Sequence, residues 1–113
     1  MAVIAVITNL PDSESAFNLA RILVERRLAA CANVLAPATS FFRWQGRMEE
    51  APEVPVILKT TAERYPELER ALRELHPYDL PEILAFDARQ GLTAYLEWVE
   101  RECKVLSADS PAP

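Results

Sequence analysis

The spacing of apolar residues changes from strand-like to helix-like within the first thirty positions. Residues 2–8 form a short, mostly β-branched apolar run, which predicts a strand buried on both faces. From Ala16 onward, apolar side chains recur every three or four residues, which predicts a helix over residues 13–27. Asp12 and Ser13 precede this stretch with oxygen atoms that can cap a helix start. The chain therefore opens with a strand and a helix.

Two extended segments around a tight turn predict a long hairpin. Residues 28–35 predict a central strand, Pro37 interrupts it, and extended character resumes over residues 39–44. Residues 45–46 (Gln-Gly) then offer a reversal, because glycine adopts positive φ without strain. Residues 53–60 return as the partner strand. Prolines in and before this segment confine its first part to a sheet edge or a bulge.

The length of this hairpin has a consequence for assembly. Residues 29–44, at ~3.3 Å each, would span on the order of 50 Å. A domain of this size is only about 30 Å across. The hairpin must therefore bend, bulge or project. A projecting ribbon carrying Phe41, Phe42 and Trp44 would expose apolar surface unless another subunit covers it, so we expect an oligomer.

The second half of the chain predicts two helices with a strand between them. An apolar stripe through Leu68 and Leu75 predicts a helix that ends before Pro77. Residues 83–86 predict a strand, and a last helix follows with Thr93 as its expected cap.

The order β-α-β-β-α-β plus a terminal helix predicts an α+β, ferredoxin-like sandwich, with an antiparallel sheet and helices on one face. We expect one domain over residues 1–104 and a disordered tail over residues 105–113.

Composition excludes several functional classes. The chain has 113 residues, half of them apolar, and a formal net charge of −5. Its basic residues are scattered among acids, which argues against a nucleic-acid surface. No apolar run reaches the ~18 residues of a membrane helix, and residues 1–7 lack the basic start of a signal peptide. Cys31 and Cys103 lie far apart without a CxxC pattern, which favours free thiols and a cytoplasmic location.

Residues 76–82 (HPYDLPE) form the densest polar and aromatic cluster. One interpretation is a functional site stiffened by two prolines; the other is a rigid connection between helix and strand. Tyr78, Asp79 and Glu82 could act as acid and base, but the sequence offers no activated nucleophile or complete metal set beside them. We therefore expect no enzymatic activity.

Three other positions each allow more than one interpretation. Cys31 lies in an apolar strand and is by default a buried, inert thiol, although Cys31 with His76 could bind copper if other subunits or Glu82 completed the site. Lys59, in mid-strand, needs a carboxylate or a ligand anion unless it faces solvent. Trp44 fills an interface or covers a pocket, and we favour the interface.

Five segments, found in the right order over roughly residues 2–102, together resemble the CutA family of divalent-cation tolerance proteins. They are residues 28–33 (LAACAN), 39–49 (TSFFRWQGRME), 57–60 (ILKT), 76–83 (HPYDLPEI) and 95–98 (YLEW).

The resemblance implies a homotrimer in which long hairpins pair between neighbours, with an architecture similar to the PII signalling trimers. It implies an inter-subunit pocket formed by Cys31, Asn33, Trp44, Lys59, Tyr78 and Glu82, with His76 nearby. It also implies copper or another divalent cation as a candidate ligand. Thr8 and Leu75 stand where copper-binding members carry a cysteine and a second histidine.

From these observations we expect a cytoplasmic, non-enzymatic homotrimer that takes part in the response to metal ions and requires no cofactor. Copper binding by Cys31 and His76 belongs to this interpretation. The alternative is a PII-like signalling or scaffold trimer that binds a small anionic ligand near Lys59. We expect no nucleic-acid partner and no membrane insertion.

Overall fold

The computed structural model describes residues 2–105, and its element order confirms the predicted ferredoxin-like α+β fold. The elements are β1 (Val3–Leu10), α1 (Ser13–Glu25), β2 (Cys31–Val34), β3 (Ala38–Trp44), β4 (Arg47–Thr61), α2 (Tyr65–Leu75), β5 (Leu84–Asp87) and α3 (Thr93–Glu102). Of the tail predicted over residues 105–113, residues 106–113 lie outside the described part.

The sheet is antiparallel with strand order β2-β4-β1-β5, and β3 pairs with β4 away from this path. The 15 residues of β4 make this possible. Its first half pairs with β3, and its second half lies between β2 and β1, so that Lys59 stands opposite both Cys31 and Ala5. One strand thus belongs to both the sheet and the projecting hairpin.

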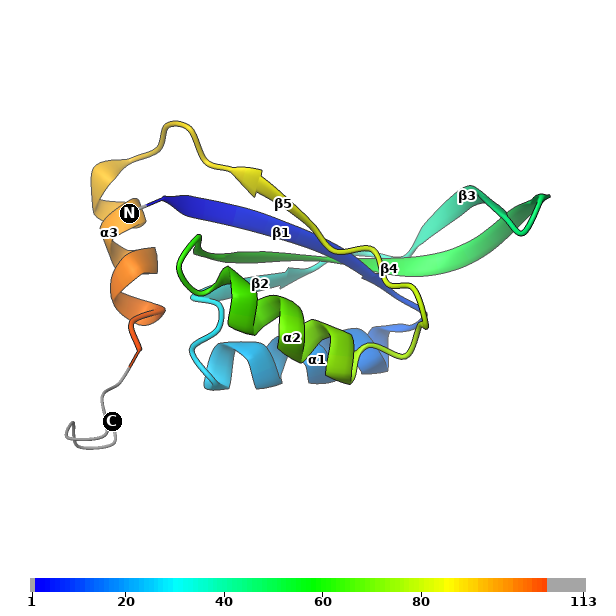
Figure 1. The fold of residues 1–113 in the computed structure, drawn as a ribbon, viewed down its shortest axis with the longest axis horizontal. Coiled ribbons are helices and arrows are strands. Elements are labelled where there is room, and N and C mark those ends of the chain that lie inside the picture. The colour runs from blue at the N-terminus through cyan, green and yellow to red at the C-terminus, as the bar shows by residue number, and fades with distance from the viewer. Residues whose placement is uncertain (1, 106–113) are drawn as a thin grey trace.

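Helices α1 and α2 cover one face of the sheet (Figure 1). The main core lies between these two helices and the sheet. Along β1, Val6 and Thr8 point into this core and are fully buried, whereas Ala5 and Ile7 alternate onto the other face and are half-buried. We call this other face the open face. The prediction that the first strand is buried on both faces is therefore wrong for most of the strand in a single subunit, because on β1 helix α3 covers the open face only at Val3.

Helix α1 begins as predicted and ends two residues early. The Asp12 carboxylate accepts a hydrogen bond from the Ser15 amide at 2.8 Å, and this contact lowers the pKa of Asp12. At the other end Arg27 has φ +59°, a left-handed conformation that closes a helix rather than continuing it. The helical spacing through Arg27 did not reveal this stop, because arginine is uncommon at a left-handed position.

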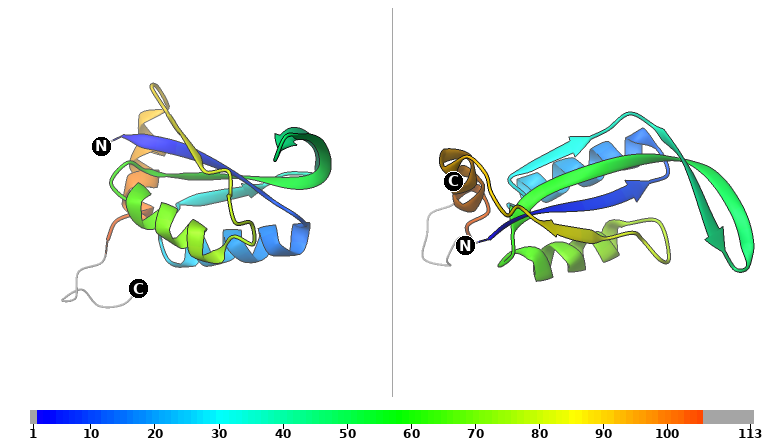
Figure 2. Two further views of the ribbon diagram at one scale, coloured as in Figure 1. Left: turned by 45° about the vertical axis from the view of Figure 1, so that its right-hand side comes forward. Right: turned by 90° about the horizontal axis from the view of Figure 1, so that it is seen from above.

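The β3–β4 hairpin, which we call the ribbon, bends and projects from the body of the protein (Figures 1 and 2). Its two-residue turn has positive φ at Gln45 and at Gly46, as a type I′ turn requires. The ribbon contributes to an overall extent of 50 × 30 × 23 Å. The predicted projection is confirmed.

Helix α3 lies at the end of the sheet opposite the ribbon (Figure 1). Val99 and Cys103 pack there against Val3 in a small second core. Thr93 does not cap this helix; the cap position is Leu92, without a side-chain hydrogen bond. Across residues 2–105 no helix has both the length and the apolar character to cross a membrane.

Candidate functional site

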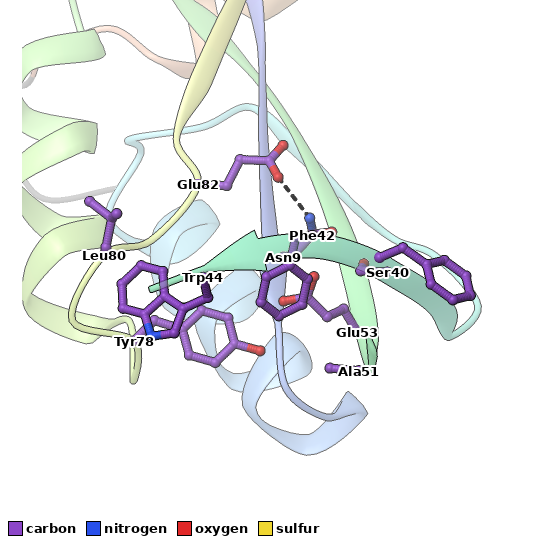
Figure 3. A pocket seen from close by; sticks show the side chains of 10 residues that line it. Asn9, Ser40, Phe42, Trp44, Ala51, Glu53, Tyr78, Leu80 and Glu82 are labelled. Carbon is purple, nitrogen blue, oxygen red and sulfur yellow. Dashed lines mark hydrogen bonds between the residues drawn. The ribbon is translucent and has the colours of Figure 1, made fainter. Parts of the chain in front are cut away.

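A cavity of about 660 Å³ opens between the ribbon and the body of the protein (Figure 3). Its walls come from β1, β3, β4 and the connection between α2 and β5. The lining residues are Asn9, Ser40, Phe41, Phe42, Trp44, Ala51, Glu53, Tyr78, Leu80 and Glu82. Its volume falls within the range of small-molecule sites.

The pleat of the ribbon supplies one wall. Side chains two residues apart on a strand share a face, so Ser40, Phe42 and Trp44 point the same way from β3. The register places Ala51 opposite Ser40 and Glu53 opposite Ala38 on this same face of β4. The β3–β4 pairing thus turns Phe42, Trp44 and Glu53 to the same face of the ribbon.

Asn9 joins the two remaining walls. Its side-chain Nδ2 donates a hydrogen bond to Glu82 Oε1 at 2.9 Å, drawn as a dashed line in Figure 3. Its backbone oxygen accepts a hydrogen bond from His76 Nε2 at 2.8 Å. The end of β1 is therefore tied to both ends of the segment that carries Tyr78 and Glu82.

His76 is a buried residue that fixes this segment, with only 7% of its surface exposed. The Tyr78 amide donates a hydrogen bond to Nδ1 at 3.2 Å, which makes Nδ1 an acceptor and assigns the proton to Nε2. Burial lowers the pKa of His76, although the bond to Asn9 and the Glu53 carboxylate oppose this effect. Both ring nitrogens of the neutral imidazole are therefore engaged in hydrogen bonds.

Tyr78 presents a protonated hydroxyl to the cavity. Burial, and then the nearby Glu53 carboxylate, raise the pKa of Tyr78 to about 12. Its ring lies against the His76 imidazole with centroids 4.9 Å apart. At neutral pH this hydroxyl is a hydrogen-bond donor and not a base.

The six predicted pocket residues separate into two groups within one subunit. Trp44, Tyr78 and Glu82 line the cavity, whereas the other three lie together on the open face. There Lys59 Nζ donates a hydrogen bond to Asn33 Oδ1, and Cys31 Sγ lies 3.8 Å from the same oxygen.

The two groups are separated along β4. Asn9 stands opposite Pro55, whereas Cys31 stands opposite Lys59, four residues farther along the strand. At ~3.3 Å per residue this places the two groups roughly 13 Å apart. Cys31 is half-buried rather than buried, and the fully buried thiol is Cys103.

Sequence reasoning did not single out Asn9, Glu53 or Leu80 as site residues. Asn9 had a recognisable signal, since it is a polar residue inside an apolar strand. Glu53 had none, because only the β3–β4 register turns it to the same face of the ribbon as Phe42 and Trp44.

The described residues of one subunit do not fit a copper site. Residues 2–105 contain no group of three or more His, Cys, Asp or Glu side chains that could hold a metal ion. His76 would have to give up a hydrogen bond to coordinate one. Thr8 is fully buried, and its hydroxyl is a poorer ligand for copper than a thiolate. The copper ligands Cys31 and His76 stay a prediction that depends on another subunit.

Comparison with known proteins places this geometry in context. Residues 4–102 match the family of the CutA1 divalent ion tolerance protein. The chain is similar to the divalent-cation tolerance protein CutA of Thermus thermophilus, with 42% identity over 94 residues, which are 83% of this chain and 91% of that protein. It is also similar to the human protein CutA, with 37% identity over 94% of this chain but only 59% of that longer protein.

Solved structures show the same fold. The divalent cation tolerance protein Cut A1 from Thermus thermophilus superimposes with a TM-score of 0.87 at 39% identity, covering 88% of this chain and 97% of that one. CutA from the bacterium Xylella fastidiosa also gives a TM-score of 0.87 at 39% identity, over 90% of this chain and 98% of that one.

Proposed function

Because the chain belongs to the CutA1 divalent ion tolerance protein family, we propose that it acts as a homotrimer in the response to metal ions, with the cavity beside the ribbon as its ligand site. The proposal includes no catalytic step. The divalent-cation tolerance function is that of the family, and the trimer, the ligand site and the lack of catalysis are the parts proposed here.

The main support for the proposed trimer is the exposed apolar surface on the open face of the sheet. Leu84 and Phe86 on β5 stand opposite Ile7 and Ala5 and are half exposed. Phe41 on the ribbon is more exposed still. Apolar surface of this extent is unfavourable in water, and a second copy of the chain would bury it.

The strand edges support the same assembly. β2 and β5 lie at the two ends of the main strand order, and β3 pairs with β4 along one edge only. Unpaired strand edges bind other strands. A cyclic trimer in which the ribbons pair with neighbouring subunits would satisfy these edges without leaving an open end.

The absence of catalysis is supported by the chemistry of the cavity. The protonated Tyr78 hydroxyl is a weak base at neutral pH, because its pKa is raised to about 12. Glu53 and Glu82 are the other ionisable groups that line the cavity. Ser40 and Tyr78 are the hydroxyl groups of the lining set, and that set contains no histidine or lysine to activate them, so this group of residues is suited to binding.

A second candidate function concerns the open face. The partner of Lys59 is the uncharged Asn33 amide, which leaves the lysine charge uncompensated. A small anionic ligand at Lys59, in a PII-like signalling or scaffold trimer, would neutralise it. A thermal-shift screen of nucleotides and carboxylates tests this function, and Lys59→Ala must abolish any response. A response that survives this substitution would refute the site.

The cytoplasmic location is supported by the two free cysteines, which suit a reducing compartment. Direct copper binding would require neighbouring subunits to bring further ligands to Cys31 or His76, because one subunit, over its described residues 2–105, does not contain a sufficient set.

Native mass spectrometry of the purified protein, with and without stoichiometric copper, tests the proposal. We expect a species of three times the 12.7 kDa subunit mass. Copper taken up in threes would support a metal site repeated in each subunit, whereas a metal-free trimer would leave the cavity as the working site. A monomer at micromolar concentration would contradict the proposed assembly.

A further inference from the structure

We propose that Lys59 of one subunit forms an ion pair with Glu82 of the partner subunit, so that a neighbouring copy of the chain brings the positive charge that the cavity beside the ribbon lacks. The lining of that cavity contains two carboxylates and no Lys, Arg or His. The inference rests on the proposed function for the homotrimer, and it adds the contact that orients each subunit against the next.

Both charges lie on the open face of the sheet, but at different levels along β4. The residues on either side of Lys59 in the strand are fully buried, so the half-buried Lys59 side chain points to the open face. Glu82 is exposed and bonded to Asn9, which occupies an open-face position of β1. Asn9 stands opposite Pro55, four residues before Lys59. At ~3.3 Å per residue the two charges are separated by roughly 13 Å along the strand, too far for an ion pair within one subunit.

An uncharged amide orients each of these charges. Lys59 Nζ donates a hydrogen bond to Asn33 Oδ1. Glu82 Oε1 accepts a hydrogen bond from Asn9 Nδ2 at 2.9 Å (Figure 3). An amide fixes the direction of a charged group without supplying the opposite charge, and over residues 2–105 neither Lys59 nor Glu82 belongs to an ion pair. Each is therefore a directed charge without a counter-charge.

The two charges lie toward opposite edges of the sheet. Asn33, the partner of Lys59, lies on β2, at one end of the strand order β2-β4-β1-β5. Glu82 lies in the connection that leads into β5, at the other end. In a cyclic assembly that is joined head to tail, one surface of each subunit meets a different surface of the next. A β2 edge that faces a β5 edge brings Lys59 of one subunit toward Glu82 of the partner subunit.

The proposed trimer gives both charges a reason to pair. A neighbour that covers the apolar open face also takes the charges of that face out of water, where an unpaired charge is unfavourable. The pair between Lys59 and Glu82 neutralises one charge of each sign at every contact of the ring. Opposite charges on the two surfaces also disfavour wrong alignments of the subunits. The acidic side of the cavity is thus completed by a residue of the neighbour.

Glu53 is the other carboxylate that could receive the lysine, because it lines the same cavity. Its carboxylate already interacts with the Tyr78 hydroxyl of its own subunit. It is also half-buried within one subunit, whereas Glu82 is exposed. Glu82 is therefore the more accessible partner, and Glu53 is its matched control.

Charge reversal in the full chain tests the pair. Lys59→Glu and Glu82→Lys should each raise the concentration at which the trimer half dissociates by about tenfold or more, because each sets like charges against one another. The double variant restores opposite charges in reversed order and should recover most of the lost affinity, measured by sedimentation equilibrium. A double variant that dissociates as readily as the weaker single variant would overturn the pair.

Neutral variants test the same pair with less risk to folding. Glu82→Gln should weaken the trimer in the wild-type background and have little further effect in the Lys59→Gln background, since the pair is then already broken. Glu53→Gln should have the same effect in both backgrounds. Equal effects of Glu82→Gln in both backgrounds would refute the pair, and this is also the result expected if a free anion neutralises Lys59.

The mass of the wild-type protein separates failure of the pair from failure of the assembly. A wild-type trimer in which the effects of Lys59→Gln and Glu82→Gln simply add overturns the pair and leaves the proposed assembly standing. A wild-type monomer at micromolar concentration overturns the assembly and the pair with it. Circular dichroism of each variant shows whether a change in mass comes from dissociation or from unfolding, and the pair predicts dissociation to folded subunits.

Discussion

His76 Nε2 donates a hydrogen bond to the backbone oxygen of Asn9 across 2.8 Å, which joins the end of α2 to the end of β1. The two residues are 67 positions apart in the chain. Because the other ring nitrogen accepts from the Tyr78 amide, one buried imidazole sets the position of two cavity walls. A residue first considered as a metal ligand is thus part of the framework of the site.

Substitution of His76 should affect both stability and binding. His76→Leu keeps a similar volume but leaves the Asn9 oxygen and the Tyr78 amide without their partner. We expect a loss of about 1–3 kcal/mol in the free energy of unfolding, measured by urea denaturation at fixed protein concentration. Leu75→Met, at the preceding and partly buried position, is a control that should cost less, because it conserves volume and breaks no hydrogen bond. Equal effects would contradict the framework role.

Stability should decrease in mild acid. The pKa of His76 is lowered in the folded protein, mainly by burial, so the unfolded chain binds a proton first. Stability is therefore full above an unfolded-state pKa of about 6.5 and is lost as the pH falls from there through the lowered folded-state pKa. Denaturation curves at several pH values between about 8 and 5 should show this slope in the wild type. The His76→Leu variant should show a smaller slope, and an unchanged slope would assign the effect to other groups.

Thr8 offers a stabilising substitution. Its hydroxyl is fully buried in the main core and has no hydrogen-bond partner among the described residues. Thr8→Val removes this unsatisfied group at constant shape and should raise the free energy of unfolding by about 1 kcal/mol. Thr60, equally buried, is the matched control, because its hydroxyl donates to the Leu28 oxygen at 2.7 Å. Thr60→Val should therefore destabilise the protein by a similar amount. Changes of the same sign in both variants would refute the argument.

The open face can be tested with two phenylalanines of equal exposure. Phe86 on β5 and Phe17 on α1 are each 52% exposed. Only Phe86 lies on the face that we assign to the trimer, so Phe86→Glu should dissociate the protein to smaller species in light scattering after size-exclusion chromatography. Phe17→Glu should keep the mass of the parent protein. Dissociation by both substitutions, or by neither, would place the interface elsewhere.

The turn of the ribbon gives a prediction about backbone strain. Gln45 has φ +51° at the first turn position, where asparagine is preferred and β-branched residues are strained. Gln45→Asn should stabilise the protein by about 0.5 kcal/mol, and Gln45→Val should destabilise it by about 1 kcal/mol or more. Thermal unfolding of the three proteins, compared at one concentration, checks this order.

Local patterns in the sequence were sufficient for the fold. The spacing that predicted α1, the Gln45-Gly46 turn and the proline that ends α2 depends on neighbours within a few residues, and each was confirmed. The end of α1 was missed because the left-handed conformation of Arg27 is imposed by the packing that follows it. The local sequence favours a helical conformation at Arg27, but the tertiary structure overrides this preference.

The site was predicted only in part, because it depends on register. Trp44, Tyr78 and Glu82 were proposed and do line the cavity. Glu53 was not, since its place on the same face of the ribbon as Phe42 follows from which residue of β4 stands opposite which residue of β3. A shift of one position would turn Glu53 to the other face of the ribbon, and no single-residue property reveals that choice.

The uninterrupted course of β4 has a mechanical consequence. Its second half is fixed in the core by Val56 and Leu58, and its first half carries Ala51 and Glu53 into the cavity wall. Because β4 is held in the core at one end, a small rotation there would move its outer half by a larger distance. Substitutions at Leu58 should therefore change how well the cavity fits its ligand, although Leu58 does not line it. Ligand affinity then becomes a sensitive measure of packing in the core.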